Sequence, residues 1–255
     1  MIDDNRYFRR NRQAVVFDSA CFYITALLVV AVLIVPVLPK TAYTNTNPSV
    51  VATAQRIIVI DPGHGGHDHG VIGAQGLSEK QVMLEIARHI SERLGSEFKV
   101  QLTRTGNYNM DIRSRMSIAN NHKADLFLSL HAGGSSRSGV SGWTVYHHQL
   151  KTGSQNFSGN EQAPFFWNQL QQRHISAATR LAANIGKRLE AGAAGQPVDI
   201  IGAPLAVLSG ANMPAVLVET GYLTHPPTAR SLAQVAFVKA IADDIAGGIR
   251  DFFEK

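Results

Sequence analysis

Several residue types that would define other classes of protein are scarce in this chain of 255 residues. A single cysteine cannot form an internal disulfide, which excludes a disulfide-stapled scaffold and a cysteine-rich zinc site. The 22 glycines and 10 prolines are close to ordinary usage, so collagen-like and low-complexity arrays are excluded. Hydrophobic residues make up 45% of the chain, which is too many for a disordered protein. The chain is therefore expected to fold around a sizeable core.

Motifs for nucleotide, serine-hydrolase and nucleic-acid chemistry are also missing. Gly63-His64-Gly65 begins like a dinucleotide-binding loop, but Asp68 stands where the third glycine belongs. The sequence has no phosphate-binding GxxxxGK[ST] loop, no GxSxG nucleophile elbow and no basic–aromatic stripe for single-stranded nucleic acid. The net charge of +5 favours an anionic partner, such as a membrane face, nucleic acid or an acidic polymer, without choosing among them. No nucleic-acid partner is predicted.

The N-terminal part of the chain differs in composition from the rest. Residues 1–19 begin with an arginine-rich stretch, and residues 20–38 are uncharged and rich in valine, leucine and isoleucine. About 20 apolar residues are needed for a helix to cross a bilayer, and basic residues before such a run favour a cytoplasmic N-terminus. We therefore predict a basic cytoplasmic N-terminus (1–19), a transmembrane signal anchor or signal peptide (20–38), a linker (39–55) and a folded domain (56–255).

The apolar run is longer than the usual core of a signal peptide, about 7–15 residues, which favours an anchor over a cleaved signal. Either reading places the folded domain on the extracytoplasmic, periplasmic side of the inner membrane, tethered to it or exported.

Strands alternate with helices from Arg56 onward. Short runs rich in apolar and β-branched residues predict strands, and apolar residues at spacings of three and four predict helices. The predicted strands are 57–60, 98–103, 126–130, 142–147, 205–208 and 215–218, and the predicted helices are 78–94, 111–121, 174–191 and 228–249. This alternation predicts a single α/β domain with a twisted mixed, mostly parallel sheet flanked by helices on both faces.

Four polar residues follow the predicted strands closely. His131 and Glu219 come directly after apolar strands, His64 lies four residues past the first strand, and Glu79 opens the helix that follows it. Because functional groups gather beyond the carboxyl ends of parallel strands, these side chains are expected to meet at one edge. A catalytic zinc ion takes three histidine or carboxylate ligands, and the fourth residue could then act as a general base. A single histidine at a strand end is more often a hydrogen-bonded surface residue than a metal ligand, and His67 and His69 are expected to face solvent.

The same residues lie within stretches that resemble one known family, the zinc-dependent N-acetylmuramoyl-L-alanine amidases of the amidase_3 type. The resemblance covers about residues 56–250. Five stretches carry it in order, namely Val59-Ile60-Asp61-Pro62-Gly63-His64-Gly65-Gly66, Ser78-Glu79-Lys80, Leu102-Thr103-Arg104-Thr105, residues 124–132 (ADLFLSLHA) and residues 214–223 (PAVLVETGYL).

This resemblance implies one catalytic Zn²⁺ held by His64, Glu79 and His131, with Glu219 as the catalytic glutamate. It implies a substrate, peptidoglycan, and a reaction, hydrolysis of the amide between the N-acetylmuramic acid lactyl group and L-alanine. It further implies a role in cell wall remodelling and daughter-cell separation. Residues 56–255 would then be the zinc amidase catalytic domain.

The sequence departs from the family pattern in places and leaves other functions open. Gly133-Gly134 follows His-Ala where the family often has asparagine, and Ser209 stands where a basic residue is frequent. Residues 148–173 are interpreted as a surface loop, with a lid or a docking element for a protein activator as the alternative. Two alternative functions are a non-catalytic peptidoglycan-binding module and a zinc peptidase with another amide substrate.

Overall fold

The computed structural model describes residues 55–73, 76–149 and 170–254. The predicted N-terminal tail, the apolar segment 20–38, nearly all of the linker and most of residues 148–173 lie outside these ranges. No helix within the described ranges is long and apolar enough to cross a bilayer. The described residues belong to one compact unit that spans Ala52–Lys255.

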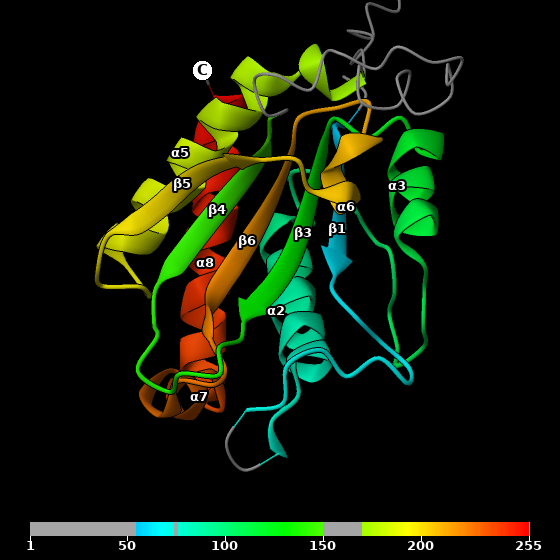
Figure 1. The fold of residues 1–255 in the computed structure, drawn as a ribbon. Coiled ribbons are helices and arrows are strands. Elements are labelled where there is room, and N and C mark those ends of the chain that lie inside the picture. The colour runs from blue at the N-terminus through cyan, green and yellow to red at the C-terminus, as the bar shows by residue number, and fades with distance from the viewer. Residues whose placement is uncertain (1–54, 74–75, 150–169, 255) are drawn as a thin grey trace, which may run out of the picture. The chain divides into compact units, whose positions relative to one another are not determined.

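A six-stranded sheet forms the centre of this unit, with strand order β2-β1-β3-β6-β4-β5 (Figure 1). β4 pairs antiparallel with β6, and every other pair of neighbouring strands is parallel. The predicted mixed, mostly parallel sheet is therefore confirmed. The strands are β1 (Ile57–Pro62), β2 (Lys99–Leu102), β3 (Leu126–Gly133), β4 (Trp143–His148), β5 (Val198–Ala203) and β6 (Ala215–Tyr222).

Helices cover both faces of the sheet, as predicted. α2 (Glu79–Leu94), α5 (Ile175–Ala191) and α8 (Val235–Phe253) enclose the larger core, and α3 (Ile112–Asn121) and α6 (Ala206–Ser209) enclose a smaller one. Successive residues of a strand point to opposite faces, so in β1 Ile58 and Ile60 enter the larger core while Val59 enters the smaller. The larger core extends to the edge where β1, β3 and β6 end, through Leu130, Ala132 and Val218.

Two predictions from the sequence pattern were wrong. Residues 205–208 do not form a strand, because α6 occupies Ala206–Ser209, and the strand on this side is β5, which we did not predict. Short apolar runs do not distinguish a buried helix from a strand, and β5 gives a weak signal because most of its residues are exposed. The helix predicted at 228–249 is two helices, α7 (Pro226–Leu232) and α8, separated where Gln234 has an extended backbone.

Candidate metal centre

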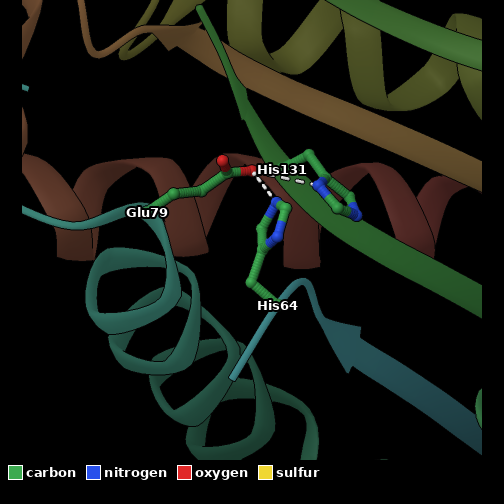
Figure 2. A group of neighbouring side chains, drawn as sticks. All are labelled: His64, Glu79 and His131. Atoms are coloured by element: carbon green, nitrogen blue, oxygen red, sulfur yellow. Dashed lines mark hydrogen bonds and ion pairs between the residues drawn. The ribbon is translucent and has the colours of Figure 1, made fainter. Parts of the chain in front are cut away.

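The structure brings His64, Glu79 and His131 together at the carboxyl ends of β1 and β3 (Figure 2). Each contributes one potential ligand atom, and the three atoms lie within 4.8 Å of one another. His64 Nε2 and His131 Nδ1 each lie 3.0 Å from Glu79 Oε1. The three residues come from the loop after β1, the first turn of α2 and the end of β3, so the juxtaposition depends on the whole parallel part of the sheet.

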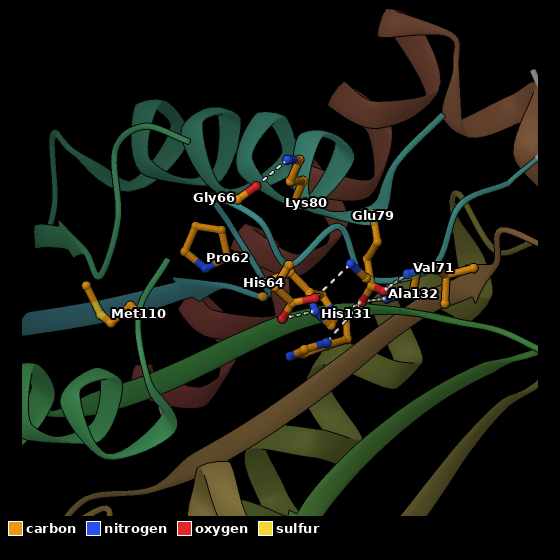
Figure 3. A network of polar contacts seen from close by, with 12 residues as sticks. Pro62, His64, Gly66, Val71, Glu79, Lys80, Met110, His131 and Ala132 are labelled. Carbon is orange, nitrogen blue, oxygen red and sulfur yellow. Dashed lines mark hydrogen bonds and ion pairs between the residues drawn. The ribbon is translucent and has the colours of Figure 1, made fainter. Parts of the chain in front are cut away.

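Glu79 is the buried centre of this cluster, with a side chain only 2% exposed. Burial alone would raise the pKa of its carboxyl, but the imidazoles of His131 and His64 hold that pKa well below its usual range. The backbone N–H groups of Val71 and Ala132 also donate to its two oxygens, each at 2.9 Å (Figure 3). Glu79 is therefore held as a carboxylate, the form that binds a metal.

Glu219 lies beside the cluster without joining it. In the pairing of β3 with β6 it is the direct neighbour of His131, so their side chains share one face of the sheet. Burial raises the pKa of the Glu219 carboxyl, while the charge of His131 lowers it and the charge of Glu79 raises it. The net effect is a carboxyl whose pKa lies above its ordinary value, which suits a group that must accept a proton and release it again.

Asp68 fixes the orientation of His64. Its Oδ2 lies 2.8 Å from His64 Nδ1, and its Oδ1 accepts a hydrogen bond from the backbone of Gly70 at 3.0 Å. With Nδ1 engaged in this way, Nε2 is the nitrogen that faces Glu79. Such carboxylate–histidine pairs commonly orient metal ligands in proteins. The neighbouring His67 and His69 are exposed, as predicted.

Two buried arginines hold the loop that carries His64. Arg115 donates to the His64 carbonyl at 2.8 Å and pairs with buried Asp61 at 2.7 Å. Arg104 donates to the carbonyls of Gly63 and Lys80 at 2.7 and 2.8 Å, which joins the loop to the first turn of α2. These bonds tie down a backbone that is unusual, since His64 itself has a φ of 60°.

Lys80 adds a further link between the loop and α2, because its ammonium group donates to the Gly66 carbonyl at 2.6 Å (Figure 3).

Gly63 is required for the close approach of the His64 loop to β3. A Cβ at this position would lie 2.4 Å from the His131 ring.

Sequence reasoning missed this supporting layer of Asp68, Asp61, Arg104 and Arg115. Arg104 was within a stretch of the family resemblance, but an arginine on a helix such as Arg115 is ordinarily solvent-exposed, and nothing in its spacing showed otherwise.

The donor set fits a catalytic zinc ion. Zinc binds histidine nitrogen and carboxylate oxygen, and catalytic sites use three protein ligands and keep one position open. The cluster offers two nitrogens and one carboxylate, held by the partners described above. The fold and the site together define an α/β protein with a His–Glu–His group suited to a divalent metal and a free carboxylate beside it.

Comparison with known proteins agrees with this class. Residues 58–251 match the amidase_3 family, described as N-acetylmuramoyl-L-alanine amidase. AmiA of Salmonella typhimurium is 30% identical over 243 residues, covering 84% of this chain and 82% of that protein. The catalytic domain of CwlV, an N-acetylmuramoyl-L-alanine amidase from Bacillus (Paenibacillus) polymyxa, superposes with a TM-score of 0.65 at 27% identity, covering 78% of this chain and 98% of that domain. AmiC2 of Nostoc punctiforme gives the same TM-score, identity and coverage. The chain belongs to the N-acetylmuramoyl-L-alanine amidase family.

Proposed function

We propose that this protein is a zinc-dependent N-acetylmuramoyl-L-alanine amidase of the cell envelope. It hydrolyses the amide between the lactyl group of N-acetylmuramic acid and L-alanine in peptidoglycan, in cell wall remodelling and daughter-cell separation. The observation that carries the proposal is the His–Glu–His cluster around the buried Glu79, with Glu219 paired directly beside His131, within a chain that matches the family over residues 58–251.

His64, Glu79 and His131 would hold the zinc ion, and Asp68 would keep the His64 ring oriented. When bound, zinc supplies a Lewis acid that polarises a carbonyl and lowers the pKa of water. Glu219 accepts the proton of the attacking water and then delivers it to the nitrogen of L-alanine as the amide bond breaks. The product peptide leaves with a free amino terminus, and the lactyl group leaves as a carboxylate.

The proposed cellular location of the enzyme follows from the predicted N-terminal segment. An apolar stretch at 20–38 would tether the domain to the membrane or direct its export, and peptidoglycan lies on that side of the membrane. A protein activator remains a prediction that rests on residues 148–173.

The test uses the purified full chain, loaded with zinc and incubated with peptidoglycan, with released fragments identified by mass spectrometry. Stem peptides that begin with L-alanine are expected. Glu219→Gln should keep its zinc and lose about 10²- to 10⁴-fold in rate, the usual contribution of a general base. Cleavage within the stem would instead establish a peptidase. Retention on peptidoglycan with zinc bound and no product, in the presence of cell envelope extract, would establish a binding module.

A further inference from the structure

The row of residues that contains His131 and Glu219 continues across the sheet. Glu219 on β6 pairs with Thr144 on β4, and Thr144 pairs with Asp199 on β5. Because paired residues on neighbouring strands present their side chains to the same face, His131, Glu219, Thr144 and Asp199 form one line. This line leads from the metal cluster to the edge strand of the sheet.

Within the described residues, the face that carries this row is exposed along β5, whereas Thr144 on β4 is buried. α5 packs on the opposite face, where Ile200 contacts Gly186. On the row's own face, α3 and α6 enclose the small core around Ala215, at the other end of β6 from Glu219. Asp199 is exposed, and Ile201, the next residue of β5 on the same face, is 40% exposed, close to the 38% of Ile200 on the opposite face. Figure 1 shows β4 and β5 with α5 and α8 behind them.

Tyr146 forms the border between this face and the small core. It pairs with Leu217 on β6 and with Ile201 on β5, and it is half-buried. Burial raises the pKa of its hydroxyl, and the negative charge of Glu219 adds to that effect, in keeping with the closeness of the two side chains. We call the face made by Glu219, Thr144, Tyr146 and Asp199 the β4–β5 strip.

The length and charge of the strip indicate what it would bind. β5 is three strands away from β3, which is about 14 Å at the usual strand spacing of about 4.8 Å. An extended peptide covers that distance in about four residues, and less if the last contact is made by a long side chain. Among the described residues, no lysine, arginine or histidine forms an ion pair with Asp199. The far end of the strip therefore offers an unneutralised carboxylate.

We infer that the β4–β5 strip binds the stem peptide of the substrate, with Asp199 contacting a free amino group on the side chain of its third residue. The inference rests on the proposed function, because it takes the scissile amide to lie between the cluster and Glu219. Stem peptides with that amine free would bind better than those with it blocked.

The test is direct binding of product peptides, which the enzyme does not cleave. The zinc-loaded full chain is titrated calorimetrically with a stem tetrapeptide that begins with L-alanine and has a free amine on the third residue. The same peptide with that amine acetylated is the comparison. The free amine should bind about two- to fivefold more tightly, the range for an exposed ion pair, and added salt should reduce the ratio. Asp199→Asn should bring the ratio close to one, and Asp199→Lys should reverse it.

A matched control is Glu190→Gln on α5, which removes an exposed carboxylate on the side of the molecule away from the strip and should keep the preference. The inference is overturned if acetylation has no effect on the unmutated protein, or if Asp199→Asn retains the preference. Hydrolysis of peptidoglycan, measured in parallel, reports on the proposed function separately. If the protein hydrolyses peptidoglycan but its preference for the free amine does not depend on Asp199, the inference about the strip fails while the proposed function stands.

Discussion

The two ends of the row from His131 to Asp199 are built in opposite ways. At the metal end, Glu79 is buried and each of its oxygens accepts a backbone hydrogen bond, and the loop carrying His64 is tied by two buried arginines. At the β5 end, the strand is mostly exposed. This difference in burial and hydrogen bonding matches the different demands that a metal site and a peripheral substrate contact place on a hydrolase. Groups that hold a metal must stay in place to within a fraction of an ångström, whereas contacts with a distant part of the substrate contribute modestly and tolerate variation.

The largest effect is expected from removing a ligand at the metal end. His64→Ala should lose high-affinity zinc binding and reduce amidase activity below detection, because two ligands cannot hold a catalytic ion against solvent. Zinc content after dialysis and release of stem peptides measure both. His67→Ala removes an exposed histidine of the same loop and should leave zinc content unchanged. Full zinc content in His64→Ala would refute the ligand assignment.

Next in size is a change to the supporting layer. Arg115→Met leaves Asp61 as a buried carboxylate whose remaining side-chain partners, among the described residues, are the hydroxyls of Thr103 and Ser129. Breaking one partner of a buried ion pair costs about 3–5 kcal/mol, so the free energy of unfolding should fall by that amount in urea titration. Arg93→Met, which removes an exposed ion pair with Asp243, should cost no more than about 1 kcal/mol. Equal losses in the two variants would contradict the distinction.

A smaller effect is expected when the orientation of a ligand is disturbed but the ligand is kept. Asp68→Asn retains the shape of the side chain and weakens its hold on His64 Nδ1. Loss of such a partner usually costs about 10- to 100-fold in metal affinity. Competition with a chromogenic chelator measures the zinc dissociation constant. Asp68→Glu should recover part of the loss, and an unchanged dissociation constant in Asp68→Asn would show that His64 needs no such partner.

The smallest effect is expected at the β5 end. Ile201→Thr changes an exposed position and should alter the free energy of unfolding by no more than about 0.5 kcal/mol. Ile200→Thr changes a position that is 38% exposed, but the Ile200 side chain reaches Gly186 on α5, so it should cost up to about 1 kcal/mol more, close to the value of one buried methylene group. Chemical denaturation of both variants tests which face of β5 is packed. A larger cost for Ile201→Thr would place a packing surface over the strip.

Much of the fold could be predicted from the sequence because its strong signals are local. The buried strands of the parallel part are continuous apolar runs, and α2 has apolar residues at helical spacing, so both were found. The β4–β5 side was harder. β5 is an exposed edge strand with a polar residue and a glycine, and the four residues of α6 are too few to show a period.

Local sequence alone specifies the chemistry of the candidate site: two histidines and two glutamates placed where strands end or a helix begins, and glycine at position 63 next to His64. These are properties of single positions and their local spacing. Which of these groups come into contact depends on the folded chain, because contact requires a particular strand order and register. The fold places Glu79 between the two histidines and leaves Glu219 free beside His131. In the folded chain, Asp68 orients the His64 ring. Because β4 and β5 run antiparallel to the other strands, Thr144 and Asp199 lie in line with Glu219.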